Sequence, residues 1–265
     1  VEEETRFTRC TQNDPRCSAV SPCVTHGLWS ALSDVNGKFL ASVSLADVIA
    51  GGRYSAGPTR GGAKTSRPET HRTYLDYNAT APLRSEAKAA MIEALDVVGN
   101  PSSVHSEGRR ARSIIESARE SVAQLVGAKP SEIVFTSGAS EANSWALAQR
   151  WATIITSGIE HDSVLAPARA STAELVMLPV ARDGVVKVAD LSDLLSSRSF
   201  AAPALLAVQM ANNETGVIQP VAEITELARA HGIKVHIDAV QAAGRLAIDF
   251  AALGVETLAL SAHKF

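Results

Sequence analysis

Several apolar runs of the sequence end in polar side chains that could take part in catalysis. The last run, residues 257–260, leads into Ser-Ala-His-Lys and brings Ser261, His263 and Lys264 to the tip of a predicted strand. A lysine at the edge of a dry pocket loses its proton more readily, because desolvation lowers the pKa of an ammonium group. The neutral amine is a nucleophile that can form a Schiff base. Taken alone, a lysine in this place is more often a surface residue whose charged head stays in water.

A carboxylate ends another apolar run. The string H-I-D-A-V-Q places Asp238 at the tip of a predicted strand, and Gln241 follows three residues later. Burying a carboxylate there is unfavourable unless it is paired with a cation or accepts hydrogen bonds. Asp238 is therefore expected to face a partner.

Three further runs are followed by polar residues. The segment S-G-A-S-E-A-N comes after residues 133–136 and combines backbone N–H groups, the Ser140 hydroxyl and the positive end of a helix, which suits a phosphate. His161 follows residues 152–156, and Asn213 follows residues 205–210. Each of these features alone is also explained by an ordinary helix cap, surface histidine or turn.

Together, these features match one cofactor. A phosphate cradle, an aromatic histidine, a carboxylate and a reactive lysine are what pyridoxal phosphate requires. The carboxylate keeps the pyridine nitrogen protonated so that the ring can accept electrons, and the lysine carries the aldehyde and later moves the substrate α-proton. The sequence therefore predicts a pyridoxal phosphate site.

The elements that must position these residues alternate along the chain from Tyr74 onward. Strands are predicted at residues 133–136, 152–156, 175–180, 205–210, 234–238 and 257–261. Helices are predicted at residues 82–98, 107–126, 141–150, 163–170, 189–196 and 221–231. This alternation predicts an α/β layered domain with a mainly parallel sheet, and such domains bind ligands at the carboxyl ends of their strands.

Composition narrows the class of protein. The chain has 265 residues, of which 46% are hydrophobic and 20% charged, as in globular proteins generally. A net charge of −3 gives no support for nucleic-acid or anionic-membrane binding. The start of the sequence is acidic, and the longest apolar run near it, residues 39–50, is too short to span a bilayer. We therefore predict a cytoplasmic protein without nucleic-acid or membrane partners.

Residues 1–72 differ from the rest. They show no sustained periodicity and end in a Gly-, Ser-, Pro- and Thr-rich stretch, which predicts a poorly ordered or linker-like extension before a domain at residues 73–265. Cys10, Cys17 and Cys23 lie in this extension and could be a disulfide pair plus one, a metal site with His26, or plain thiols. Their spacing matches no common zinc pattern, so no metal site is predicted.

A set of strings in residues 73–265 resembles the cysteine desulfurases, which are class V, fold-type I pyridoxal phosphate enzymes. In order they are Y-L-D-Y-N-A-T-A-P-L, G-N-P-S-S-V-H-S-E-G-R, F-T-S-G-A-S-E-A-N, I-E-H-D-S-V, N-N-E-T-G-V-I-Q-P, H-I-D-A-V-Q-A-A-G and S-A-H-K-F. The resemblance implies the three-layer large domain of fold type I, incomplete at its C-terminus.

The resemblance also implies roles for individual residues. Lys264 would form the Schiff base, Asp238 would pair with the pyridine nitrogen, and His161 would stack on the ring and assist proton transfer. Further cofactor-binding positions are two pairs at the phosphate, Ala139 with Ser140 and Ser261 with His263, and one pair near the ring hydroxyl, Asn213 with Gln241.

The activity implied is the conversion of L-cysteine to L-alanine, with sulfur passed to an enzyme persulfide and on to an acceptor protein for iron–sulfur clusters or other sulfur cofactors. A homodimer is implied as well. Family members continue past the lysine, and that part holds the persulfide-forming cysteine and the arginine that binds the substrate carboxylate. The chain is thus expected to be a fragment that is inactive alone. The alternatives are another class V enzyme, such as a selenocysteine lyase or an aminotransferase, or a non-catalytic fragment.

Overall fold

The computed structural model describes residues 73–265. The expectations for residues 1–72, including those for the three cysteines, lie outside the described residues. None of the described helices is long and apolar enough to cross a membrane.

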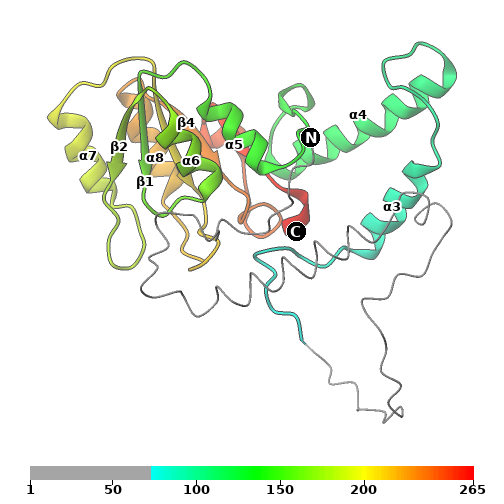
Figure 1. Ribbon diagram of the computed structural model, residues 1–265, viewed down its shortest axis with the longest axis horizontal. Coiled ribbons are helices and arrows are strands. Elements are labelled where there is room, and N and C mark those ends of the chain that lie inside the picture. Colours follow the sequence, from blue (N-terminus) through cyan, green and yellow to red (C-terminus); the bar gives the residue numbers. More distant parts are fainter. Residues whose placement is uncertain (1–72) are drawn as a thin grey trace, which may run out of the picture. The chain divides into compact units, whose positions relative to one another are not determined.

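The centre of the domain is a sheet of five parallel strands (Figure 1). The strands are β1 (Thr153–Ser157), β2 (Glu174–Leu178), β3 (Ala204–Gln209), β4 (Lys234–Asp238) and β5 (Thr257–Ala259). Their order in the sheet is β2-β1-β3-β4-β5. The chain therefore runs outward from β1 to β2 and then returns to pair β3 with the other side of β1. This reversal creates a switch point, where ligands bind in sheets of this type.

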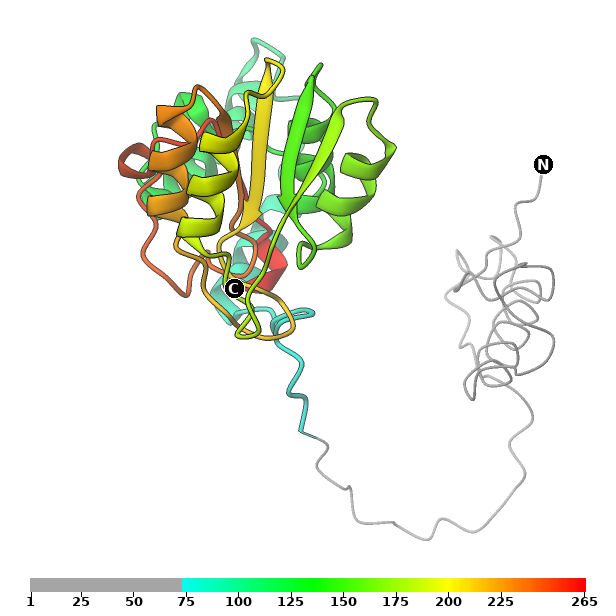
Figure 2. The same cartoon turned by 90° about the vertical axis from the view of Figure 1, so that its left-hand side faces the viewer.

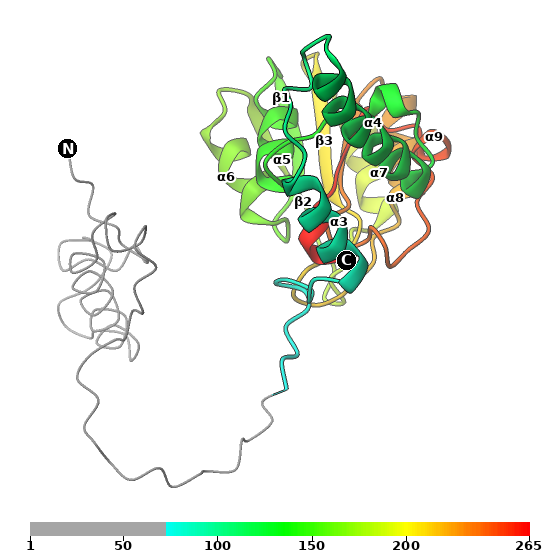
Figure 3. The ribbon, with the colours of Figure 1, turned by 90° about the vertical axis from the view of Figure 1, so that its right-hand side faces the viewer.

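Helices cover both faces of the sheet. The described helices are α3 (Ser85–Leu95), α4 (Ser106–Val126), α5 (Ala139–Leu147), α6 (Asp162–Ala170), α7 (Val188–Ser197), α8 (Val221–Ala230) and α9 (Phe250–Leu253), with short 3₁₀ turns η1 (Pro130–Glu132) and η2 (Ala262–Lys264). No residue of α3 is buried. Figures 2 and 3 show α7 and α8 on one side of the strands and α5 and α6 on the other. The predicted layered α/β architecture is confirmed.

Two apolar cores explain why the strands read as continuous hydrophobic runs. All six residues of β3 are buried. Leu206 packs with residues of α7 and α8, whereas Leu205, which points to the opposite face, packs with residues of α5 and α6. A strand covered on both faces has no polar side to show in its sequence.

One predicted strand is wrong. Residues 133–136 are extended but pair with no strand in the described part of the chain. Val134 remains 68% exposed and Phe135 48% exposed. The run has the β-branched and aromatic residues of a strand, but strand formation depends on a neighbouring strand and on burial as well as on local composition. The other predicted strands are confirmed, with ends shifted by up to two residues.

Candidate active site

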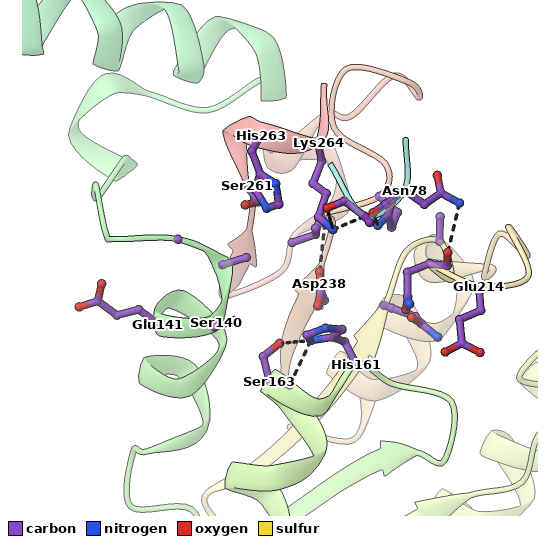
Figure 4. A pocket seen from close by; sticks show the side chains of 18 of the residues that line it. Asn78, Ser140, Glu141, His161, Ser163, Glu214, Asp238, Ser261, His263 and Lys264 are labelled. Atoms are coloured by element: carbon purple, nitrogen blue, oxygen red, sulfur yellow. Dashed lines mark hydrogen bonds between the residues drawn. The ribbon is translucent and has the colours of Figure 1, made fainter. Parts of the chain in front are cut away.

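A cavity of about 870 Å³ lies at the carboxyl ends of β1, β3, β4 and β5. The structure brings all the predicted site residues to its wall (Figure 4): Ala139, Ser140, His161, Asn213, Asp238, Gln241, Ser261, His263 and Lys264. They meet because parallel strands end at the same edge of a sheet. Their roles toward a ligand stay predictions.

Asp238 is the last residue of β4 and is only 6% exposed. Its Oδ1 accepts a hydrogen bond from the Val240 backbone N–H at 3.0 Å, and its Oδ2 accepts one from Asn143 Nδ2 at 2.8 Å. Burial raises the pKa of Asp238, while these hydrogen bonds and the nearby His161 and Lys264 act to lower it. No salt bridge involves Asp238 among residues 73–265. The pocket thus holds a buried carboxyl group that lacks a cationic partner in direct contact.

His161 caps the N-terminus of α6 and lies beside Asp238 (Figure 4). Its Nδ1 accepts a hydrogen bond from the Ser163 backbone N–H at 3.1 Å and lies 2.8 Å from the Ser163 hydroxyl oxygen. Because Nδ1 uses its lone pair as an acceptor, the hydrogen of the neutral ring belongs on Nε2. The ring is fixed at one end by its own helix.

Lys264 belongs to η2 and is partly buried. Its Nζ donates to the backbone oxygen of Asn78 at 2.7 Å and to that of Ala79 at 2.9 Å. Gln241 Nε2 donates to the same Asn78 oxygen at 2.9 Å. The amine therefore has hydrogen-bond acceptors but no carboxylate in direct contact, and it faces the same cavity as Asp238.

Arg245 joins the pieces around the lysine. It donates to Gln241 Oε1 at 2.5 Å, to the Lys264 backbone oxygen at 2.8 Å and to the Tyr77 backbone oxygen at 3.2 Å. Sequence reasoning missed both Arg245 and the backbone oxygens of Asn78 and Ala79. The only signal was the quoted string around Asn78, because contacts across more than 160 residues leave no periodic trace.

The N-terminus of α5 forms an open cradle of backbone amides at the cavity. Gly138 precedes the helix without a side-chain cap, and a Cβ built on it would meet nothing within 4 Å. The first amides of a helix have no intrahelical acceptor, and Ala139 and Ser140 at the start of α5 line the cavity. The Ser137 amide and hydroxyl both donate to the Glu141 carboxylate, at 2.6 and 2.7 Å. These bonds lower the pKa of Glu141 and keep its charge to the side of the cradle.

A second buried carboxyl group precedes His161. Glu160 is 6% exposed, and its Oε1 accepts a hydrogen bond from the Ser157 hydroxyl at 2.5 Å. Burial is the main cause that raises the pKa of Glu160 to about 8, and the negative charge of Asp238 adds to it. The raised pKa favours the neutral form of Glu160, which immediately precedes His161 in the chain. Sequence reasoning missed it because its burial depends on β3 and its following loop.

Within residues 73–265, no three or more His, Cys, Asp or Glu side chains lie close enough together to hold a metal ion.

Comparisons with known proteins agree with the geometry. Residues 73–265 match the aminotransferase class-V family model. The chain is 42% identical over 203 residues to the cysteine desulfurase IscS of Dictyoglomus turgidum, covering 72% of this chain and 50% of that protein. It is 37% identical over 246 residues to the selenocysteine lyase of Bos taurus, covering 78% of this chain and 55% of that protein.

A solved structure shows the same fold. A NifS-like protein from Rickettsia africae superposes with a TM-score of 0.69 at 35% identity, covering 73% of this chain and 55% of that one. The predicted fold-type I architecture is thereby confirmed. The chain spans about half the length of the curated relatives it matches. From the matched family model and these relatives, the chain belongs to the aminotransferase class V family.

Proposed function

We propose that this pocket binds pyridoxal phosphate and serves a cysteine desulfurase that removes sulfur from L-cysteine and releases L-alanine. The observation that carries the proposal is that a buried carboxyl group, Asp238, and a lysine amine, Lys264, line the same cavity. Asp238 lies 6% exposed at the end of an apolar strand, without an ion pair among the described residues. A protonated pyridine nitrogen supplies the missing cation.

The other residues fit the same group. The cavity volume of about 870 Å³ lies within the usual range for small-molecule sites. The open amides at the start of α5 suit a phosphate. The positions that would hold the cofactor are Lys264 at the aldehyde carbon, Asp238 at the ring nitrogen, His161 against the ring face, Asn213 and Gln241 near the ring hydroxyl, and Ala139, Ser140, Ser261 and His263 at the phosphate.

When bound, the cofactor supplies an electron sink for bond cleavage at the substrate's α-carbon. The residues of this chain do the rest. Asp238 holds a proton on the ring nitrogen through a charge-assisted hydrogen bond. Lys264 Nζ would take the α-proton as a neutral amine: the backbone oxygens of Asn78 and Ala79 orient it through two hydrogen bonds, whereas a carboxylate partner would favour its protonated form.

Sulfur transfer needs a thiolate that this pocket does not contain. No cysteine occurs after Cys23 in the sequence. We propose that the thiol comes from outside residues 73–265 and that this chain alone binds cofactor without completing sulfur transfer. An acceptor protein for the sulfur, a role in iron–sulfur cluster synthesis and a homodimer belong to the same proposal.

A selenocysteine lyase is the second candidate. It is supported by relatives of that name at 37% identity over much of this chain. Both activities cleave the same bond position in a small amino acid, so the cofactor pocket described here serves either. Product analysis with L-cysteine and L-selenocysteine on the assembled enzyme separates them.

The test of cofactor binding is a visible absorption titration of the 265-residue chain with pyridoxal phosphate. The expected result is a visible band in the unsubstituted chain that is lost in Lys264→Ala and kept in Lys187→Arg, a lysine far from the cavity wall. A band that persists unchanged in Lys264→Ala would overturn the assignment of the lysine. The absence of any band in the unsubstituted chain would overturn binding itself.

A further inference from the structure

A line of polar side chains runs beneath the cavity, from the exposed Thr257 on β5 to the buried Asp238. The Thr257 hydroxyl lies 2.8 Å from His236 Nδ1, and His236 Nε2 lies 2.9 Å from Asn143 Oδ1. Asn143 Nδ2 donates to Asp238 Oδ2 at 2.8 Å. Asn143 is 0% exposed, His236 1% and Asp238 6%, so water does not compete for the contacts among these three side chains. The network connects the sheet edge with the carboxyl group of the site.

Asn143 is the branching point of this network. Its Nδ2 also donates to the Ser163 hydroxyl at 2.9 Å, and that hydroxyl lies 2.8 Å from His161 Nδ1 (Figure 4). The amide thus uses both of its hydrogens and its oxygen. One side chain on α5 contacts Asp238 directly and reaches His161 through a single hydroxyl.

Donors and acceptors in this network are arranged in one direction. Asn143 Nδ2 donates to Asp238 Oδ2, so the amide oxygen of Asn143 faces His236 Nε2. His236 Nε2 then carries a hydrogen, and Nδ1 accepts the hydrogen of the Thr257 hydroxyl. Burial lowers the pKa of His236 to about 4, which keeps the ring neutral at physiological pH. A neutral ring donates from one nitrogen and accepts at the other, as this arrangement needs.

The branch from Asn143 through Ser163 to His161 also has one direction of hydrogen-bond donation. The Ser163 oxygen accepts from Asn143, which leaves its own hydrogen free to donate to His161 Nδ1. Since the Ser163 backbone N–H also points at Nδ1, this nitrogen is held without a hydrogen. The hydrogen of His161 is thereby fixed on Nε2.

We propose that Asn143 is a positioning residue that holds Asp238 as a hydrogen-bond acceptor and His161 as its Nε2–H tautomer, with its amide orientation fixed by His236 and Thr257. The proposal rests on the proposed function only for the identity of the ligand that these two groups meet. Asn143 itself lies behind them, with its amide fully used by protein partners.

The network can be tested without cofactor. Nitrogen-15 NMR of the histidine rings in the 265-residue chain, assigned with His236→Gln and His161→Gln, reports which ring nitrogen carries the hydrogen. The expected result is Nε2–H for both rings, with His236 showing no protonation between pH 5.5 and 8.5. An Nδ1–H tautomer at His236, or titration of that ring near its ordinary pKa, would overturn the proposed polarity.

A second experiment measures the consequence for the ligand. Asn143→Asp keeps the size and the acceptor toward His236 but removes the donors toward Asp238 and Ser163. The dissociation constant for pyridoxal phosphate is expected to rise by roughly tenfold or more, the scale of one hydrogen bond to a charged group. The His161 signals should lose their single tautomer in the same variant, which a loss of stability alone would not cause.

Thr225→Val is the matched control. Thr225 is 1% exposed on α8, and its hydroxyl has no hydrogen-bond partner among the described residues. Thr225→Val alters a buried polar residue outside the network, so it should leave cofactor affinity and the His161 tautomer unchanged. If Asn143→Asp binds the cofactor as tightly as the unsubstituted chain, the positioning role fails while the proposed function stands. If the unsubstituted chain binds none, the proposed function fails and the tautomers still decide the network.

Discussion

Two parts of the domain differ in the kind of side chain that they bury and expose. At the cavity, polar groups are buried and most of them are paired, as Asn143, His236 and Asp238 show. On the other side of β5, apolar groups lie open: Val134 is 68% exposed and Trp145 53% exposed along a groove of about 500 Å³. Residues 73–265 thus bring the polar side chains of the cavity together while leaving this apolar groove exposed.

This difference suggests that ligand binding and self-association depend on different parts of the domain. Polar positions at the cavity are held by strand ends and by hydrogen bonds within residues 73–265. Apolar surface of this kind favours association, because monomeric proteins seldom expose contiguous apolar patches. We therefore expect cofactor-related properties to respond to changes at the cavity and solution behaviour to respond to changes at the groove.

The largest effect should come from the buried carboxyl group of Glu160. Its pKa is raised from 4.5 to about 8 in the folded chain, so its contribution to stability is fully present below pH 4.5 and lost as pH rises through 8. Between pH 5.5 and 8.5 the loss is on the order of 3 kcal/mol in the free energy of unfolding. Urea unfolding at both pH values measures it.

Glu160→Gln is the control that isolates the contribution of Glu160 to the pH dependence of stability. His236, whose pKa is lowered to about 4, acts in the opposite sense, since its contribution is lost as pH falls below 6.5. That contribution is common to both proteins and cancels in their difference. The variant should lack the alkaline loss of stability, and an equal loss in both proteins would show that Glu160 is not buried as described.

Asp238→Asn should weaken pyridoxal phosphate binding by about 10- to 100-fold, because a neutral amide replaces the charge that would face the ring nitrogen. Asp249→Asn is the matched change at a residue that lines neither the cavity nor the groove. Asp249 caps α9 by accepting from the Ala252 backbone N–H at 2.9 Å, a role that asparagine also fills. Equal affinities for the two variants in an absorption titration would contradict the assignment of Asp238.

Thr257 connects the two regions, since it lies on β5 at the groove and contacts His236 in the network. Thr257→Val removes the donor to His236 Nδ1 and should cost about 1 kcal/mol of stability, with a faster hydrogen exchange of the His236 ring N–H. Thr257→Ser keeps the hydroxyl and should resemble the unsubstituted chain in that exchange. If serine and valine behave alike, the hydroxyl plays no part in the network.

The smallest effect on stability should come from Val134→Ser at the groove, within about 0.5 kcal/mol. Its effect should be on self-association, measured by sedimentation velocity over a range of concentrations. Val104→Ser removes an equally apolar residue that is 87% exposed and does not line the groove. A larger decrease in association for Val104→Ser than for Val134→Ser would mean that the groove is not the adhesive surface.

The sequence predicts the cavity better than the rest because its signals are local. A buried parallel strand such as β3 reads as an apolar run, and the residue after each run lies at the same edge of the sheet. That reasoning finds Asp238, His161 and Lys264. It cannot find Asn143, which reads as an ordinary helical residue until His236 and Asp238 are placed around it.

Residues 133–136 show that strand-like composition alone is not enough to predict a strand. Their composition is that of a strand, yet within the described residues no strand lies beside them. Similarly, the burial of Glu160 follows from packing between loops that are about 50 residues apart, as the bond from Gln209 to the Ile159 oxygen illustrates. Local patterns give elements, while pairing and burial depend on residues distant in sequence.

The central claim is that Lys264 and Asp238 form one cofactor site, and borohydride trapping tests it most directly. The 265-residue chain is incubated with pyridoxal phosphate, reduced, digested and mapped by mass spectrometry, beside Asp238→Asn. The account predicts cofactor mass on the peptide that contains Lys264 and on no other lysine, with a lower yield in the variant at limiting cofactor. Labelling spread over surface lysines such as Lys187, with Lys264 unmodified, would contradict it.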